Sequence, residues 1–339
     1  GSEVPVLNPH IVPGAVLQLV APCSSGKSWR LRQWLKMMQE LYPKHRFLSI
    51  GVRITHCTDQ HFEMQEKDGI RCELYNDLEY KDVRDMTNES LVVQLQSLLR
   101  FERQANFTTV ILDEVCSLLS YFSADSASMF KDMEGRQTML PFTAALERRC
   151  READYLILAD ADLLMNDTVR HFVDGVCAGR EVHTLQISEV KPFVQRTLKV
   201  NYDSGIGQSV GFPRELLEAI QAVKSDPEER IFIACNAKKL AAQENRTLPS
   251  GSNPSYYDVL VMNGIRPDEI VVVHGEVGSK EKCSMFSDLS GVLRDKKVLI
   301  ATTAVTVGIN IEVKFGRIFA HTHRNTSTVR DMMQLLPRV

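Results

Sequence analysis

Short apolar runs alternate with longer, helix-length segments along the whole chain. The runs are about five residues long, are rich in Val, Ile and Leu, and end in polar or small residues. Runs of this kind are typical of strands that are buried on both faces of a parallel sheet. They predict strands over 16–20, 46–51, 109–113, 155–159, 197–202, 230–235, 269–274, 297–302 and 317–321.

The segments between these runs have the apolar spacing and the end signals of helices. Asn166, for example, stands where an N-cap would open a short amphipathic stretch. We predict helices over 27–42, 88–106, 141–152, 166–174, 213–224, 237–245 and 279–293. Regular alternation of strand and helix predicts an α/β fold with two doubly wound parallel-sheet domains in tandem.

Length and composition agree with two globular domains. The chain has 339 residues, of which 44% are hydrophobic and 24% charged. This length exceeds what one core usually serves, and the composition excludes disordered and collagen-like classes. No stretch approaches the ~18 apolar residues of a membrane span, and the first residues lack the features of a signal peptide. We therefore expect an intracellular protein of the nucleus or cytoplasm, with no membrane partner.

Charge is distributed unevenly along the chain. Residues 1–190 hold 20 basic and 27 acidic side chains, whereas residues 191–339 hold 20 and 16. The change of sign and the helix-breaking Pro192 place the domain boundary after residue 190, so we expect domains at 1–190 and 191–339. The eight cysteines form no CxxC pair, and neither His56/His61 nor His321/His323 has a pair of cysteines nearby that would complete a metal site. A zinc site is therefore not expected.

The strongest local signal is Gly26-Lys27-Ser28, which ends a turn between the first strand and the first helix. Inward-pointing N–H groups in such a turn and at the helix N-terminus form a cradle for phosphate. Lys27 would reach the β- and γ-phosphates of ATP, and the Ser28 hydroxyl would bind Mg²⁺. The rest of the cradle would be formed by Ala21, which stands where the general motif has glycine, and by Cys23, Ser24, Ser25 and Gly26.

A second signal is the apolar strand over 109–113, which ends in Asp113 and Glu114. Side chains at the carboxyl end of a buried strand face the ligand crevice of an open α/β sheet. Asp113 can hold Mg²⁺, and Glu114 can polarise the water that attacks the γ-phosphate. Together with the phosphate-binding turn, this pair predicts hydrolysis of a nucleoside triphosphate.

These two blocks resemble motifs I and II of superfamily 2 helicases, and most of all the helicase region of herpesvirus-type replication origin-binding proteins. Further blocks resemble later motifs in the same order over roughly residues 14–339. They are Ile50–Arg53 with Thr55 (motif Ia), Ala159–Asp162 (III), Ile231–Asn236 (IV), Ala301–Asn310 (V) and Gln334–Arg338 (VI).

The resemblance implies two RecA-like domains that form an ATP-dependent DNA helicase or translocase associated with replication. It implies contacts of Arg53, Thr55, Thr302 and Thr303 with single-stranded nucleic acid, for which DNA is favoured and replication proteins are candidate partners. The Thr hydroxyls suit phosphate oxygens, which carry no sequence information. The resemblance also implies nucleotide contacts by Gly308 and Asn310 and catalytic roles for Gln334 and Arg338.

Two departures from the motif VI pattern affect the expected activity. Pro337 stands where the pattern has glycine, and the pattern's second arginine would fall after Val339. Such an arginine contributes ~10³–10⁵ in rate in other nucleotidases. We therefore expect this chain to bind ATP and to hydrolyse it slowly. No stretch resembles a module that reads bases, so sequence recognition is not expected.

The motifs leave two other interpretations open. The same motor could act on RNA, because backbone contacts read mainly sugar and phosphate. Alternatively, the chain could be a weakly hydrolysing, nucleotide-gated scaffold; the intact Lys27, Asp113 and Glu114 argue against this, and Pro337 argues for it.

Overall fold

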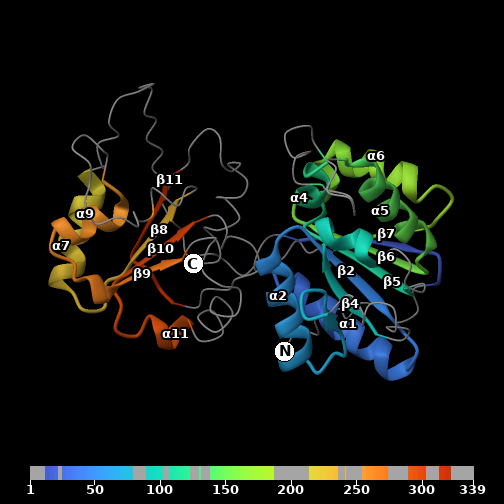
Figure 1. The fold of residues 1–339 in the computed structure, drawn as a ribbon, viewed down its shortest axis with the longest axis horizontal. Coiled ribbons are helices and arrows are strands. Elements are labelled where there is room, and N and C mark those ends of the chain that lie inside the picture. The colour runs from blue at the N-terminus through green and yellow to red at the C-terminus, as the bar shows by residue number, and fades with distance from the viewer. Residues whose placement is uncertain are drawn as a thin grey trace. The chain divides into compact units, whose positions relative to one another are not determined.

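The chain divides into two compact units, Gly1–Pro192 and Phe193–Val339, which are described separately. The computed structural model in Figure 1 describes residues 12–21, 25–78, 89–101, 107–122, 130, 138–186, 214–235, 241, 254–273, 289–302 and 313–321. The predicted strand over 197–202 lies outside these residues, as do most of the predicted helices over 237–245 and 279–293.

The first unit is built on a seven-stranded sheet whose paired strands are all parallel. The strand order is β3-β4-β2-β5-β6-β1-β7. The bounds are Val16–Val20 (β1), Phe47–Gly51 (β2), Glu73–Leu74 (β3), Leu91–Gln94 (β4), Thr109–Asp113 (β5), Tyr155–Asp160 (β6) and Val182–Gln186 (β7). β1 and β5 have the predicted bounds, and the long apolar strands occupy the centre.

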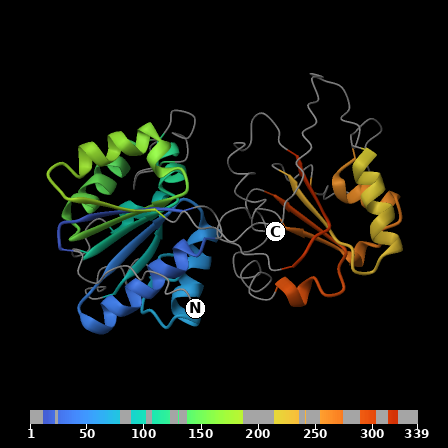
Figure 2. The ribbon, with the colours of Figure 1, turned by 180° about the vertical axis from the view of Figure 1, so that it is seen from behind.

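Helices cover both faces of this sheet, as Figures 1 and 2 show. One face carries α1 (Lys27–Leu41) and α2 (Ile54–Phe62), and the other carries α4 (Val115–Ser120), α5 (Leu140–Glu152) and α6 (Asp167–Val176). The arrangement follows from right-handed crossovers. The chain moves toward β3 after β1 and β2, and it moves in the opposite direction after β4, β5 and β6.

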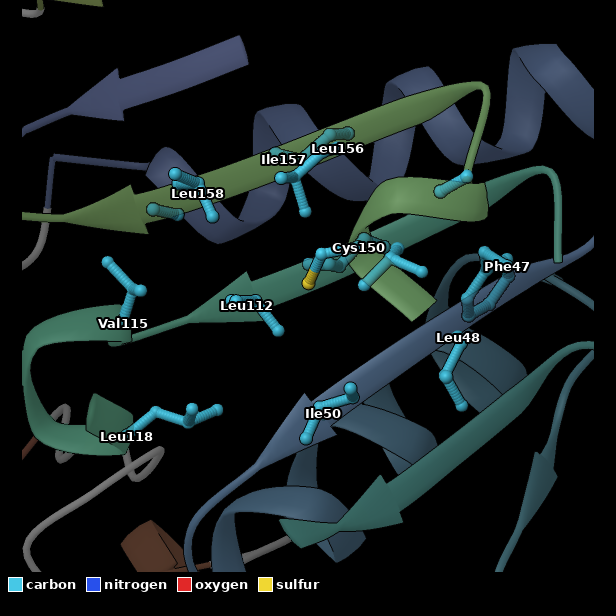
Figure 3. Packing of buried hydrophobic residues seen from close by; sticks show 14 of the residues in the cluster. Phe47, Leu48, Ile50, Leu112, Val115, Leu118, Cys150, Leu156, Ile157 and Leu158 are labelled. Carbon is cyan, nitrogen blue, oxygen red and sulfur yellow. The ribbon is translucent and has the colours of Figure 1, made fainter. Parts of the chain in front are cut away.

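The core of the first unit is one cluster that includes both faces of the central strands. Every residue of β1, β2 and β5 is buried. Figure 3 shows side chains of β2, β5 and β6 together with Val115 and Leu118 of α4 and Cys150 of α5. Burial on both faces explains why these strands are mostly apolar and do not alternate between apolar and polar residues.

The second unit holds a four-stranded parallel sheet with the order β11-β8-β10-β9. Successive residues of β8 point to opposite faces, so that Ile231, Ile233 and Cys235 belong to one core cluster and Phe232 and Ala234 to another. The strands are Ile231–Cys235 (β8), Ile270–Val273 (β9), Val298–Thr302 (β10) and Arg317–His321 (β11). Among the described residues of this unit, the helices are α7 (Arg214–Ser225), α9 (Tyr256–Met262) and α11 (Leu289–Val292).

The predicted helix over 88–106 is wrong. Leu91–Gln94 forms β4, and Leu95–Phe101 forms a 3₁₀-helix. Leu95, Leu98 and Phe101 are all buried. Their spacing of three suggested an α-helix, but it also suits a 3₁₀-helix, in which positions i and i+3 lie on the same side. β4 forms because Leu91-Val92-Val93 fits between β3 and β2, a tertiary constraint that local spacing does not reveal.

Several elements were not predicted. β3 and β7 are edge strands, and β7 has exposed and half-buried residues in alternation instead of an apolar run. α2, which continues into one turn of π-helix at Glu63–Lys67, α4 and α9 were also missed. The start of α6 is confirmed, since the Asn166 side chain accepts a hydrogen bond from Val169 N at 3.1 Å. None of the helices in the described part of the chain is long and apolar enough to cross a membrane.

His45 makes the stability of the first unit dependent on pH. Its ring is buried, lies edge-on to Trp34 and contacts Thr109 Oγ1 through Nε2 at 3.1 Å. Burial lowers the pKa of His45 to about 4, against about 6.5 in an unfolded chain. At a pH between these two pKa values, His45 is protonated in the unfolded chain and neutral in the folded one. The stability conferred by neutral His45 is therefore complete above pH ~6.5 and falls by about 1.4 kcal/mol per pH unit below it.

We expect the unfolding free energy at pH 5 to be about 2 kcal/mol lower than at pH 7 through His45 alone. Denaturant titrations of wild type and His45→Gln at both pH values measure this contribution as the difference between the two pH dependences. His171→Gln, at an exposed position of α6, is the matched control and should keep the wild-type dependence. An unchanged pH dependence in His45→Gln contradicts the prediction.

Candidate active site

Those predicted nucleotide-binding residues of the first unit that the structure describes gather at the carboxyl edge of its sheet. β1 leads into the turn before α1, and β5 leads into Asp113 and Glu114. β1 and β5 both pair with β6, one on each side. Since parallel strands end at the same edge, the turn and the acidic pair meet where open α/β sheets bind ligands.

The N-terminus of α1 is suited to an anion. Gly26 has φ 80° and precedes the helix as its N-cap, a left-handed conformation that favours glycine. Within the described residues, no side chain caps this end, and no acidic residue lies in the first turn. The first N–H groups and the helix dipole are therefore available to a phosphate. Ser25 Oγ is also buried here, with no hydrogen-bond partner among those residues.

Lys27 and Ser28 both contact Asp113. Lys27 Nζ lies 3.8 Å from Asp113 Oδ1, and the Ser28 hydroxyl donates to Asp113 Oδ2 at 3.3 Å. The Lys27 side chain is 14% exposed and that of Asp113 5% exposed. Because both side chains are largely shielded from solvent, the attraction between their charges is stronger than it would be in water. The structure therefore brings together the first two residues of α1 and the acidic end of β5.

The Ser28–Asp113 pair fits a magnesium ion. A hydroxyl and a carboxylate are hard oxygen ligands, and Mg²⁺ in nucleotide sites takes one or two protein ligands, with phosphates and water supplying the rest. Among the described residues, no group of three or more His, Cys, Asp or Glu side chains could hold a metal ion without such help. The site would thus hold Mg²⁺ together with a nucleotide.

Glu114 is held in a strained backbone conformation. Its φ is 57°, and it is the single non-glycine residue with positive φ in the described part of the chain. This conformation costs about 1–3 kcal/mol, and strain of this kind concentrates at functional sites. Glu114 is also buried, and its N–H donates to Asp113 Oδ1 at 3.1 Å. The turn therefore holds both carboxylates next to each other at the end of β5.

Asp160, at the end of β6, supports this turn. Its carboxylate accepts hydrogen bonds from Cys116 N at 2.9 Å and Ala161 N at 2.7 Å. Asp160 is 1% exposed, so these hydrogen bonds to its carboxylate are shielded from water. The block that resembles motif III is thereby joined to the segment directly after Glu114. Ala21, which is buried, lies beside it and donates its N–H to Asp160 O at 3.3 Å.

Two further residues that lie close to Asp113 were not predicted from the sequence. Gln60 Nε2 donates to Asp113 Oδ2 at 3.0 Å, and His56 Nε2 lies 3.7 Å from the same oxygen. Both belong to α2, where positions i and i+4 share a face. That spacing could have identified them if the helix had been predicted. Arg53 is the N-cap of this helix, and Thr55 lies in its first turn.

The remaining predicted site residues divide into two groups. Thr302 ends β10 of the second unit and is buried. The others lie outside the described residues: Cys23, Ser24, Thr303, Gly308, Asn310, Gln334 and Arg338. Their proposed roles continue to depend on the sequence alone.

Comparison with known proteins gives the family. A family model described as origin of replication binding protein matches residues 3–336. A search of curated proteins finds no match. Similar solved structures include a variant of Saccharomyces cerevisiae Dbp5 bound to RNA and ADP BeF3, with TM-score 0.58 and 15% identity over 95% of this chain and 75% of that one.

Two more structures have the same fold. Mycobacterium smegmatis helicase Lhr bound to ssDNA and AMP-PNP has TM-score 0.56 and 16% identity over 95% of this chain and 42% of Lhr. Mss116p bound to ssRNA and AMP-PNP has TM-score 0.59 and 11% identity over 96% of this chain and 63% of that one. The chain thus spans less than two thirds of either. It has the fold of two-domain RecA-like helicases, and it belongs to the herpesvirus-type family of origin of replication binding proteins.

Proposed function

We propose that the chain is an ATP-driven motor that moves on single-stranded DNA during replication inside the cell. The observation that carries this proposal is the meeting of Lys27, Ser28 and Asp113 at the sheet edge. A cation, a hydroxyl and a carboxylate in this arrangement fit a magnesium–triphosphate group. The family, whose description refers to replication origins, supports DNA and replication as the setting.

Each residue of the site in the first unit would have its own role in ATP binding and hydrolysis. The α1 N-terminus and Lys27 would bind the phosphates and neutralise negative charge that develops on them. Ser28 and Asp113 would hold Mg²⁺, which when bound supplies further charge neutralisation. Glu114 would accept a proton from the attacking water, a role suited to a carboxylate held next to the phosphate site. Gln334 and Arg338 remain proposed catalytic residues, and Gly308 and Asn310 proposed nucleotide contacts, on the motif resemblance.

Movement requires that nucleic acid alter the nucleotide site. Arg53 and Thr55 lie at the start of α2, and the same helix carries Gln60 to Asp113. Thr302 and Thr303 would provide the corresponding contacts in the second unit. Contacts of this kind reach phosphates, so binding would not depend on base sequence. Replication proteins would be the partners of such a motor.

Steady-state ATPase assays with Mg²⁺ test the proposal. A single-stranded DNA, an RNA of the same sequence and length, and buffer alone are compared at saturating ATP. We expect DNA to stimulate ATP turnover more than RNA does. Stronger stimulation by RNA would instead identify an RNA motor, such as its structural neighbours Dbp5 and Mss116p suggest. ATP binding without stimulation by either strand would reject the motor and favour a nucleotide-gated scaffold.

A further inference from the structure

We propose that Gln60 is a positioning residue that couples nucleic-acid binding at Arg53 to the Asp113 carboxylate. This inference rests on the proposed function, since it assumes that Arg53 meets a strand and that Asp113 serves the nucleotide. It gives Gln60, in the second turn of α2, a role in coupling the two sites. Binding of the nucleotide alone does not require this role.

The Gln60 amide is oriented by a bond at each end. The Ser49 hydroxyl of β2 donates to Gln60 Oε1 at 3.0 Å, and Gln60 Nε2 donates to Asp113 Oδ2 at 3.0 Å. Ser49 is fully buried. Because a hydroxyl can donate to the amide oxygen and the carboxylate can only accept from the amide nitrogen, one orientation satisfies both contacts. Gln60 thereby joins the neighbouring strands β2 and β5 through their side chains.

Asp113 is consequently held by two different parts of the unit. Lys27, Ser28 and the Glu114 N–H approach it from the nucleotide side. Gln60, with His56 as a second neighbour, approaches it from α2. Hydrogen bonds to a carboxylate are stronger than neutral ones and depend on direction. A displacement of α2 must therefore turn the carboxylate or break its contact with Gln60.

The start of α2 is packed tightly on the end of β2. A Cβ atom at Gly51 would lie 2.7 Å from Cys57 Sγ, so a larger residue there would force the buried Cys57 side chain to shift. Cys57 N donates to Arg53 O at 3.0 Å, and Gln94 Nε2 donates to Val52 O at 3.1 Å. The turn is therefore joined to the helix on one side and to the end of β4 on the other. We expect a nucleic-acid strand bound at Arg53, the N-cap of α2, to shift the helix whose Gln60 contacts Asp113.

Coupling between two sites is reciprocal, so binding measurements test it without turnover. The affinity for a labelled DNA strand is measured with and without Mg²⁺ and a non-hydrolysable ATP analogue. For wild type we expect the two affinities to differ by about 5- to 150-fold, the usual range of allosteric coupling. Gln60→Met keeps the side-chain length and removes both amide contacts. It should reduce the difference to less than about 2-fold while the affinity for DNA alone stays as in wild type.

Gln39→Met is the matched control. Gln39 is a glutamine of α1 that donates to Arg71 O at 2.8 Å, and it does not contact Asp113 in the described structure. This variant should retain the wild-type coupling. Ser49→Ala is an independent second variant, because it leaves Gln60 in place and removes the bond that orients its amide. Partial loss of coupling in Ser49→Ala supports the inference even if Gln60→Met does not fold.

The outcomes separate this inference from the function on which it rests. If wild type shows coupling and Gln60→Met and Ser49→Ala retain all of it, Gln60 does not transmit the effect and only this inference is rejected. Equal loss of coupling in Gln39→Met also rejects it, since the effect would then be general. If wild type binds both ligands without coupling, both the motor and this inference are rejected.

Discussion

Replacement of Lys27 with alanine will reduce kcat/KM for ATP by at least about 10²- to 10³-fold, the usual loss when one charge-stabilising group is removed from a phosphate or oxyanion site. The ammonium lies 3.8 Å from Asp113 Oδ1 at the N-terminus of α1. Its loss removes a cation from the phosphates and leaves Asp113 without that neighbour. Both effects weaken nucleotide binding, so the affinity for a fluorescent ATP analogue should fall together with turnover.

Lys36→Ala is the control for Lys27→Ala. Lys36 is exposed on the same helix, and its loss changes the net charge of α1 equally. Steady-state kinetics and fluorescence titration should give wild-type values for this variant. If Lys27→Ala retained wild-type nucleotide affinity and turnover, the candidate active site would be incorrectly assigned.

The second large effect is expected at Glu114. Glu114→Gln should reduce single-turnover hydrolysis by about 10²- to 10⁴-fold, the usual contribution of a general base, while nucleotide affinity stays close to wild type. Glutamine has nearly the same size and meets the same backbone strain at φ 57°, so stability should change little. The amide cannot accept the proton of the attacking water.

Glu152→Gln, at the exposed end of α5, is the control for Glu114→Gln and should leave hydrolysis unchanged. The combination of retained binding and lost hydrolysis distinguishes Glu114 from Lys27, for which both are expected to fall. Wild-type hydrolysis by Glu114→Gln would show that another group activates the water.

The elements that were predicted correctly have a simple physical basis. β1 and β5 are interior strands in which all five positions are buried, so most positions are apolar and the run is recognisable within five residues. The start of α6 follows from one local hydrogen bond of Asn166. α9 had an equally local signal, a capping box of Ser255 and Asp258, which was overlooked.

The errors occur where neighbours decide the local structure. Leu91-Val92-Val93 forms a strand because β2 and β3 flank it, although the spacing from Leu95 onward suggested a helix. β7 pairs with β1 as an edge strand despite its polar, alternating pattern. In both places the backbone pairing of an adjacent strand outweighs the apolar spacing of the segment itself.

For the candidate active site, the sequence by itself determined the residues that form local units. Gly26-Lys27-Ser28 is a turn followed by a helix, and Asp113-Glu114 is a strand end, so contiguous residues suffice to identify both. Only the tertiary structure decided that Gln60 and His56 of α2 join them at Asp113, and that Asp160 binds the turn after Glu114. These contacts cross from one strand or helix to another. They arise from sheet order and close helix packing, and no spacing within a single segment encodes them.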